Sequence, residues 1–128
     1  MTNQDLLAIP CICAGACLGA LLRWQLGPLL NARDRLAWGT FTANAIGGYS
    51  IGLVLAWLDS SRDVSPLWRA TLVTGFLGAL TTFSSFSAEV VALMEESKWP
   101  LATVWIFANV VTSVTLTVAG KATLNGLR

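Results

Sequence analysis

The stretch GALTTFSSFS, residues 78–87, lies inside an apolar run and places five hydroxyl groups in the seven positions from Thr81 to Ser87. Phe83 and Phe86 stand three positions apart among these hydroxyls, and the stretch carries no charged residue. Glycine and the Thr-Thr pair weaken helix propensity, and Ser and Thr side chains can satisfy backbone groups that a break in a membrane helix releases. The stretch therefore predicts a helix over residues 68–93 that is broken near residues 78–83.

The composition around this stretch is that of a protein embedded in lipid. Hydrophobic residues make up 55% of the 128 residues and charged residues only 12%, against about 25% charged residues in soluble domains. Residues 36–58, 70–88 and 99–120 contain no charge, residues 6–30 contain only Arg23, and a helix crosses a bilayer with roughly 20 mostly apolar residues. We therefore expect an all-α integral membrane protein with one transmembrane domain, residues 1–128, whose helices span about residues 6–30, 36–58, 68–93 and 99–122.

Five of the six tryptophans fall at or near the end of a predicted helix: Trp24, Trp38, Trp57, Trp68 and Trp99. Tryptophan is enriched at both membrane–water interfaces. Burial in a core is the alternative, but it does not account for the shared position at helix ends. The connections between helices are short, so the sequence places the function of the protein within the membrane.

The Lys and Arg residues are shared equally between the two predicted sides of the membrane. One side carries Arg62, Arg69, Lys121 and Arg128, and the other carries Arg23, Arg33, Arg35 and Lys98. Because positive charge in short loops normally orients a membrane protein, either a local feature decides the orientation or the chain inserts both ways and pairs with an inverted copy. GxxxG pairs at residues 15–19 and 48–52 offer places for close helix approach. We expect a homodimer, since a closed two-fold pair is the commonest assembly.

Residues for enzyme chemistry are missing. The chain has no His, the usual general base and metal ligand, and no Ser has a His or Lys placed to activate it. Cys11, Cys13 and Cys17 share the first helix, where small apolar residues are a better interpretation than a thiolate metal site. We expect no enzyme activity and no nucleic-acid partner, only membrane lipid around the helices.

Two charged residues lie within the predicted spans, Arg23 and Glu89. Intramembrane charges are costly and indicate function by default. Arg23 either extends its guanidinium to the interface or lines a water-filled vestibule that attracts anions. Glu89 follows the hydroxyl cluster, toward the far end of the third helix. A proton-coupled exporter needs a carboxylate near the middle of the bilayer, and neither residue is clearly placed there by the sequence.

Uncharged polar side chains are therefore the main indication of function. The second helix carries Thr40, Thr42 and Asn44, and the fourth repeats a polar side chain every four residues, at Trp105, Asn109, Ser113 and Thr117. At 3.6 residues per turn these four positions form one slowly drifting stripe. Hydrogen bonding between helices would explain one or two such groups. A stripe together with the hydroxyl cluster favours the wall of a polar path.

The groups along this path suit an anion. Carboxylates, expected in many cation pores, are absent from the spans apart from Glu89. Hydroxyl and amide groups donate hydrogen bonds, and the rim of an aromatic ring is electropositive, so the edges of Phe83 and Phe86 could face an anion. The simpler interpretation makes both rings packing residues. Carbonyls freed by the helix break could hold a cation as well.

Three stretches resemble a known family: GFLGALTTFSSFSAE at residues 75–89, GALLRW at residues 19–24 and GTFTANAIGGYSIG at residues 39–52. They are similar to the Fluc (CrcB) fluoride channels, and the resemblance covers nearly the whole chain. It implies an antiparallel, dual-topology homodimer with two separate fluoride pores, each built from both subunits. It also implies passive, selective export of fluoride across the inner (plasma) membrane of a bacterium.

The resemblance assigns roles to residues of this chain. Asn44 would match the pore asparagine that donates hydrogen bonds to the ion, and Phe83 and Phe86 would match the phenylalanines whose ring edges face fluoride. Ser84, Ser85 and Ser87 would lie beside them along the pore. Arg23 would match the vestibule arginine and Glu89 an acid with a possible role in relaying the anion. The carbonyls of Gly78 and Thr81, from both subunits, would match a structural sodium site on the two-fold axis.

The fourth helix departs from the family pattern in part. Tyr, Ser, Ser and Thr are typical at the spacing where this chain has Trp105, Asn109, Ser113 and Thr117. Trp105 keeps a donor, its indole N–H, but loses a hydroxyl, and Asn109 can both donate and accept.

Two other classes of protein remain as alternatives. A small proton-coupled multidrug exporter would need a carboxylate in the first helix, and residues 6–22 offer none; a membrane scaffold or assembly factor would use the polar groups only as contacts between helices.

Overall fold

The structure is a computed structural model that describes residues 3–31, 36–61 and 64–127. Four of the eight Lys and Arg residues of the charge comparison, Arg33, Arg35, Arg62 and Arg128, lie outside these ranges. The described residues are helical with no β-strand, in the order α1 Asn3–Leu30, α2 Trp38–Ser60, α3 Pro66–Arg69, the π-helix η1 Ala70–Leu77, α4 Gly78–Leu80, α5 Phe83–Glu95 and α6 Trp99–Gly126.

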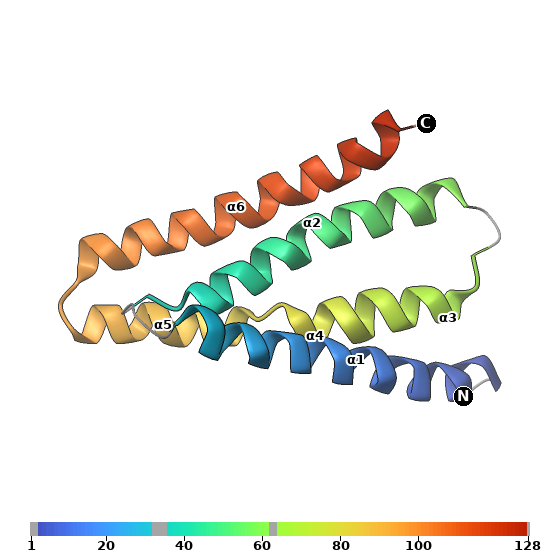
Figure 1. The fold of residues 1–128 in the computed structure, drawn as a ribbon, viewed down its shortest axis with the longest axis horizontal. Helices are drawn as coiled ribbons and strands as arrows, with labels where there is room; N and C mark the ends of the chain where they lie inside the picture. Colours follow the sequence, from blue (N-terminus) through green and yellow to red (C-terminus); the bar gives the residue numbers. More distant parts are fainter. Residues whose placement is uncertain (1–2, 32–35, 62–63, 128) are drawn as a thin grey trace.

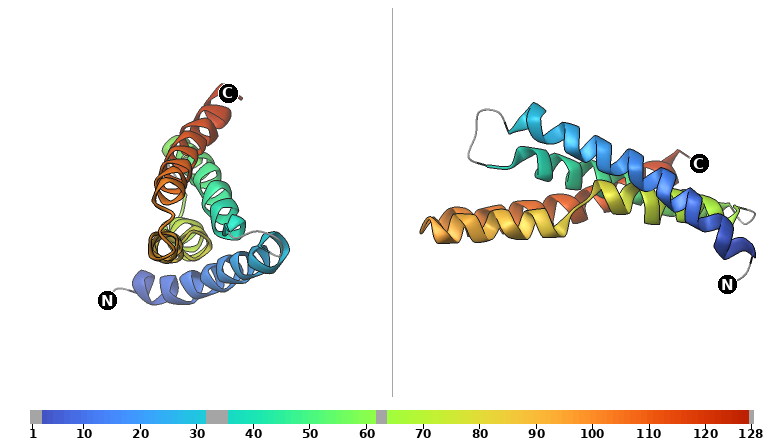
Figure 2. Two further views of the ribbon diagram at one scale, coloured as in Figure 1. Left: turned by 90° about the vertical axis from the view of Figure 1, so that its left-hand side faces the viewer. Right: turned by 90° about the horizontal axis from the view of Figure 1, so that it is seen from below.

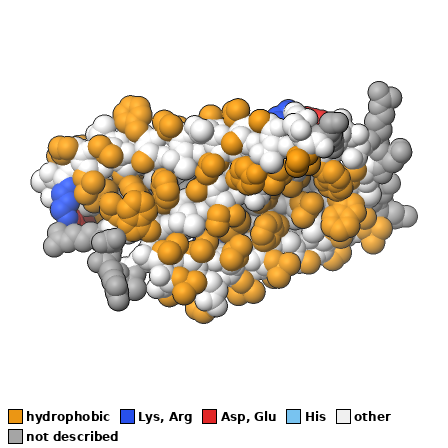
Figure 3. All heavy atoms as spheres, turned by 45° about the horizontal axis from the view of Figure 1, so that its top comes forward, with side chains coloured by type: hydrophobic (Ala, Val, Ile, Leu, Met, Phe, Trp, Pro, Cys, Tyr) orange, Lys and Arg blue, Asp and Glu red, His pale blue; other side chains and the backbone are white. Residues whose placement is uncertain are grey.

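These elements form four helical spans that are long and apolar enough to cross a membrane. The spans are Leu6–Leu30, Trp38–Ser60, Pro66–Glu95 and Trp99–Gly126. Hydrophobic side chains are spread over the middle of the surface, and Lys, Arg, Asp and Glu side chains show only at its two ends on the face in Figure 3. An apolar belt with charged ends suits a bilayer, where lipid covers the exposed apolar side chains. The predicted all-helical, multi-pass membrane protein is confirmed.

The four spans lie roughly along one axis, with both chain termini at the same end (Figure 1). α2 packs along α6, and α1 packs along η1 and α4 of the third span. α1 and α6 lie on opposite sides of the molecule, as the end view in Figure 2 shows. The single chain is thus an open arrangement in which much of α1 and α6 is exposed.

Glycines allow the closest contacts between helices. A Cβ added to Gly52 would lie 2.1 Å from the carbonyl oxygen of Thr117, so α2 and α6 meet backbone to backbone. A Cβ added to Gly19 would lie 2.2 Å from the carbonyl oxygen of Phe76, where α1 meets η1. Small residues permit such approach in membrane helices. Both GxxxG pairs therefore serve contacts within one chain and do not identify the surface for a second copy.

The third span changes its helical form twice before it breaks. Residues 70–77 form a π-helix, which the sequence analysis did not anticipate, and α4 follows for three residues. The next two residues have extended backbone. Thr81 has φ −80° and ψ 152°, and Thr82 has φ −151° and ψ 115°. The chain resumes as α5 at Phe83. The break thus lies within the range 78–83 expected from the sequence, and π-helical turns are frequent at functional sites.

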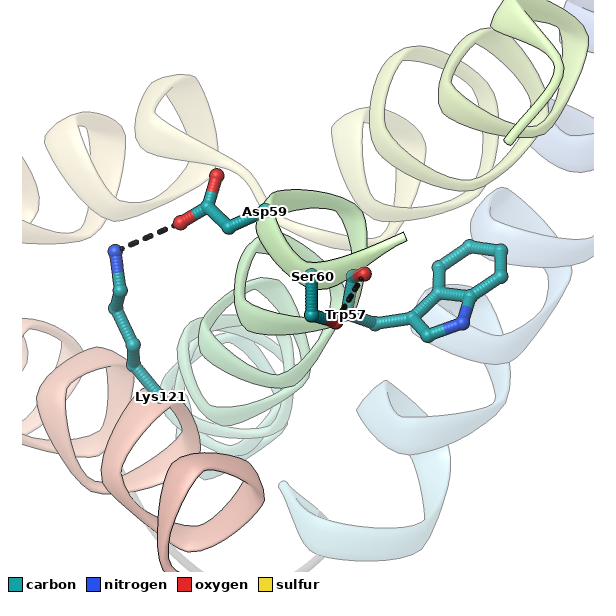
Figure 4. Close-up of polar contacts among 4 residues, drawn as sticks. All are labelled: Trp57, Asp59, Ser60 and Lys121. Carbon is teal, nitrogen blue, oxygen red and sulfur yellow. Dashed lines mark hydrogen bonds and ion pairs between the residues drawn. The ribbon is translucent and has the colours of Figure 1, made fainter. Parts of the chain in front are cut away.

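Aromatic and charged side chains mark the ends of the spans. Trp24, Trp68 and Trp99 are exposed there, as expected of residues at a membrane interface. Near the end that holds the termini, Lys121 Nζ of α6 lies 3.1 Å from Asp59 Oδ2 of α2. Figure 4 shows this ion pair, with the indole of Trp57 pointing away from it. Lys98 forms an ion pair with Glu96 at the opposite end.

Candidate functional site

The helix break is tied to α2 by the Asn44 side chain. Asn44 Oδ1 accepts a hydrogen bond from the Thr82 backbone N–H at 2.8 Å, and Asn44 Nδ2 donates to the Thr82 carbonyl at 3.2 Å. The Asn44 side-chain amide therefore replaces the two backbone hydrogen-bond partners that Thr82 would have in a regular helix. Backbone that is not helical at membrane depth needs such replacements. Nδ2 carries a second N–H, which forms no hydrogen bond within the described residues.

The same arrangement frees two carbonyl groups. In a regular helix the Thr82 N–H would bond to the Gly78 carbonyl, and the Ser85 N–H to the Thr81 carbonyl. Here Asn44 takes the Thr82 N–H, and the Thr82 hydroxyl takes the Ser85 N–H at 3.1 Å. Both carbonyls thus lose their helical donors. Carbonyl oxygens are suitable ligands for a hard cation, so the freed pair fits the kind of sodium site that the resemblance implies.

The hydroxyls of the stretch stabilise the break. Thr82 is 6% exposed and caps α5: its hydroxyl oxygen accepts from the Ser85 N–H, and its hydroxyl donates to Ser85 Oγ at 3.1 Å. Ser84 Oγ lies 3.2 Å from the Thr82 hydroxyl, and Ser87 Oγ donates to the Phe83 carbonyl at 2.9 Å. An N-cap hydroxyl stabilises a helix by about 1 kcal/mol. The cluster is therefore an N-terminal capping network for α5, a role that sequence reasoning gave only in general form.

Two grooves meet at this break. The central groove, about 300 Å³, is lined by Asn44, Thr81, Thr82, Phe83, Phe86, Asn109, Val110, Ser113 and Val114. The terminus-side groove, about 310 Å³, is lined by Asn44, Gly47, Gly48, Ile51, Val73, Leu77, Gly78, Thr81, Ser113 and Thr117. Because Asn44, Thr81 and Ser113 belong to both, the two grooves adjoin each other between α2, α6 and the third span. No charged side chain is among these lining residues.

The structure brings some of the predicted site residues together here and leaves others out. Asn44, Phe83, Phe86 and the stripe residues Asn109, Ser113 and Thr117 line the grooves, with Gly78 and Thr81. Ser84, Ser85 and Ser87 do not line either groove, and Arg23 on α1 does not either. The predicted site residues therefore divide into those that line the grooves and those that do not. The functional role of each one stays a prediction.

The two phenylalanines lie together but in different surroundings. Their ring centroids are 5.5 Å apart and their planes are inclined by 60°, an edge-to-face arrangement. Phe86 is 6% exposed within an apolar cluster, whereas Phe83 is 77% exposed in the protomer. Phe83 therefore lines the central groove from its open side, whereas Phe86 is held in the core.

The stripe on α6 reaches two different environments. Thr117 Oγ1 donates to the Gly48 carbonyl at 3.0 Å, which joins α6 to α2 inside the terminus-side groove. Asn109 is 6% exposed; its Nδ2 donates to the Trp105 carbonyl at 3.0 Å, while its Oδ1 is buried without a hydrogen-bond partner among the described residues. Trp105 is 3% exposed and points into the protein rather than into either groove. Three of the four stripe residues thus face the grooves.

Trp105 instead lines a separate cavity with Glu89. This Glu89 pocket, about 130 Å³, is lined by Leu36, Ala37, Glu89, Ala92, Leu93, Glu96 and Trp105. The Trp105 indole N–H donates to Glu89 Oε2 at 3.4 Å, and the Thr40 hydroxyl is a second hydrogen-bond partner of the Glu89 carboxylate. Leu36 and Ala37 precede α2 and Glu96 follows α5, so the pocket lies at the end of the molecule opposite the termini.

The fold and the grooves define a polytopic helical membrane protein with an uncharged polar path beside a broken helix. A family model described as "CrcB-like protein, Camphor Resistance (CrcB)" matches residues 10–121. The chain therefore belongs to the CrcB family.

Curated relatives carry the name "Fluoride-specific ion channel FluC". The relative from Paracidovorax citrulli is 48% identical over 115 residues, which cover 90% of this chain and 91% of that one. The relative from Marinobacter nauticus is 47% identical over 118 residues, covering 91% and 94%, and the one from Pseudomonas syringae is 50% identical over 112 residues, covering 85% and 87%. These matches confirm the resemblance and place the chain in a family of ion channels, not enzymes.

Sequence reasoning missed the groove-lining and capping roles of Thr82 and the aromatic packing on Trp105. Trp38 meets Trp105 edge-on, with centroids 5.3 Å apart, and Phe41 lies 5.5 Å from the same ring. The capping role had a signal in the sequence, because a Thr directly before a helix is a favoured N-cap. The aromatic contacts join residues more than 60 positions apart and had no such signal.

Proposed function

We propose that this chain forms a passive, highly selective fluoride channel that exports fluoride from the cytoplasm of a bacterium through its inner membrane. The observation that carries the proposal is the pair of adjoining grooves whose lining offers hydroxyl and amide groups and two aromatic rings but no charged side chain. The names of the relatives support fluoride as the conducted ion. The exporter alternative gains no support, since residues 6–30 contain no carboxylate.

Fluoride suits this lining because it is small and strongly hydrated. Leaving water requires fixed hydrogen-bond donors, and a hydrogen bond to a charged group contributes roughly 1.5–3 kcal/mol. The free N–H of Asn44, the Ser113 hydroxyl and the ring edges of Phe83 and Phe86 would supply such contacts in sequence. No fixed cation holds the ion, so each position releases it to the next. Chloride is larger and depends less on such donors, so a narrow pore completed by a second copy would exclude it.

A second copy of the chain would complete each pore. The grooves are open on one side in the protomer, and Phe83 at the mouth is 77% exposed. The equal sharing of Lys and Arg between the two sides supports an antiparallel, dual-topology homodimer. A two-fold dimer makes each contact twice, which gives two equivalent pores built from both subunits.

The carbonyls of Gly78 and Thr81 would hold a structural sodium ion at the two-fold axis. Both have lost their helical donors, and in a dimer the two subunits would contribute four such oxygens. A bound sodium ion supplies a fixed positive charge that neutralises these carbonyl dipoles. The proposed ligands are backbone oxygens, which suit a hard cation.

Export follows from membrane physics. Fluoride enters a cell as the neutral weak acid HF and dissociates inside, and the membrane potential, worth about 2.3 kcal/mol per charge at 100 mV, drives the anion outward. The test is growth of a fluoride-sensitive bacterium that expresses this chain. We expect growth in fluoride with the wild-type chain and none with Phe83→Ile at equal expression. Equal growth with an empty vector and the wild-type chain would overturn the proposal.

A further inference from the structure

Asn109 of α6 lines the central groove, but its side-chain amide is turned back along its own helix. The residue is 6% exposed, and Nδ2 donates to the Trp105 carbonyl, one turn earlier, at 3.0 Å. Because a carbonyl only accepts, Nδ2 is the end of the amide that faces Trp105. Oδ1 is buried and accepts no hydrogen bond from the described residues. The amide thus lies in the wall of the groove with its acceptor unused.

This position of the Asn109 amide is only weakly favoured. In α6 the Trp105 carbonyl already accepts the backbone N–H of Asn109, four positions later, so Nδ2 is a second donor to it. A neutral hydrogen bond stabilises a protein no more than a buried acceptor without a partner destabilises it. The terminal torsion of an Asn side chain is also broad. Leaving the Trp105 carbonyl therefore costs little if Oδ1 gains a partner in the same movement.

The central groove offers such partners directly beside the amide. Its volume is about 300 Å³, and a water molecule takes up about 30 Å³, so a small ion with several waters fits. Asn44 lines the same groove from α2, which packs along α6 (Figure 1). Asn44 Nδ2 has an N–H without a partner among the described residues. An anion held by Asn44 would therefore lie within the groove whose α6 wall contains Asn109.

We propose that the Asn109 amide has two positions and turns into the central groove when an anion occupies it. In the first position, Nδ2 is bonded to the Trp105 carbonyl. In the second, an N–H of Nδ2 donates to the anion, and Oδ1 accepts from a water molecule of its hydration shell. The inference rests on the proposed function, because it describes how this groove takes up its ion. The second amide would let fluoride keep one water while it exchanges others for protein donors.

The turning amide predicts a loss of apparent affinity when it is removed. Fluoride efflux from liposomes is measured at several fluoride concentrations, which gives the concentration at half-maximal rate. A hydrogen bond to a charged group is worth about a tenfold change in an equilibrium at its lower limit, so Asn109→Ala should raise this concentration by about tenfold. Asn109→Ser restores one donor and should stay within about threefold of the wild type.

Two comparisons separate the donor from an effect of side-chain size. Asn109→Ala and Asn109→Ser differ by one hydroxyl, so a merely wider groove would change both alike. Val118→Ala is the control on the same helix, because Val118 is exposed and lines none of the three cavities; its fluoride dependence should equal that of the wild type. Size-exclusion chromatography in detergent verifies that each variant is folded.

NMR of the side-chain amides reports the movement without conduction. The purified protein is labelled at asparagine, and the Asn109 signals are assigned by their loss in Asn109→Ser. We expect these signals to shift on addition of sodium fluoride and to stay in place with sodium chloride, because an N–H that leaves a carbonyl for an anion changes its environment. A merely structural Asn109 would give no such response.

The outcomes separate this inference from the proposed function. Weaker apparent affinity in Asn109→Ala together with fluoride-dependent Asn109 signals supports the two-position amide. Wild-type efflux with the same fluoride dependence in folded Asn109→Ala, or Asn109 signals that stay in place at saturating fluoride, overturns the two-position amide and leaves the channel intact. Wild-type liposomes that release no fluoride overturn the channel, and the amide falls with it if its signals also ignore fluoride.

Discussion

Replacing Asn44 with alanine should destabilise the protein through the backbone of a residue 38 positions away. The side chain makes two hydrogen bonds to Thr82, at 2.8 and 3.2 Å, and no helical partner can take their place, because Thr82 is extended. Each buried backbone group left without a partner costs about 1–3 kcal/mol. Water from the neighbouring groove can reach one of the two groups, so the expected loss is about 2–4 kcal/mol.

The assay is unfolding of the purified protein in mixed micelles by increasing SDS, followed by circular dichroism. Thr42→Ala is the matched control, since Thr42 lies two positions earlier on α2 and makes no hydrogen bond to the described residues; its loss should stay below about 0.5 kcal/mol. Asn44→Asp keeps the acceptor for the Thr82 N–H but adds a negative charge to the groove. It should therefore be more stable than Asn44→Ala and conduct fluoride at least about tenfold more slowly than wild type.

Equal stability of Asn44→Ala and Thr42→Ala would refute this reasoning, because it would show that the Thr82 peptide group does not depend on Asn44. A stable Asn44→Asp variant with wild-type conduction would refute the placement of Asn44 in the ion path. The two readouts thus test the structural and the conducting role of the residue separately.

Three further predictions follow from other contacts. Phe83→Ile should sharply reduce fluoride flux while the dimer stays intact, as size-exclusion chromatography would show. Phe86→Ile should reduce flux and also lower stability, by about 1–3 kcal/mol, because its ring is buried within the chain. Wild-type flux in either variant would contradict the role of that ring. Gly52→Ala should prevent close packing of α2 on α6, because its Cβ would lie 2.1 Å from the Thr117 carbonyl oxygen. Gly27→Ala is the control, since its Cβ would meet nothing within 4 Å, and it should be neutral or stabilising by about 0.5–1 kcal/mol. Thermal scans that show equal stability for the two variants would contradict this prediction. Lys121→Ala should lower the free energy of unfolding by less than about 1 kcal/mol, because its ion pair with Asp59 is exposed, and the difference should shrink in high salt. A large loss of stability in SDS titrations that does not depend on salt would contradict this prediction.

The sequence was sufficient to predict what depends on composition and local pattern. Four apolar stretches predicted four spans, and the Gly and Thr residues of the 78–87 stretch predicted a break that the structure has at Thr81 and Thr82. These features follow from the cost of placing charges and free backbone groups in lipid, which acts on each segment by itself.

Contacts between distant segments could not be predicted in the same way. The pairing of Asn44 with Thr82 depends on how α2 meets the third span, and an Asn in a helix is equally consistent with many partners. The π-helix at residues 70–77 arises where α1 packs closely on the third span at Gly15 and Gly19, which helix propensity does not record. The hydroxyls of Ser84 and Ser85 lie outside the grooves and face the N-cap residue Thr82, and the Ser87 hydroxyl bonds back to the Phe83 carbonyl within α5.

The most direct test of the central claim is ion efflux from liposomes that contain the purified protein, loaded with fluoride or with chloride and followed by ion-selective electrodes. Valinomycin with a potassium gradient supplies the balancing current. The account predicts rapid, complete release of fluoride and no release of chloride above that of protein-free liposomes. Equal release of both ions, or no release of fluoride from folded protein, would contradict it.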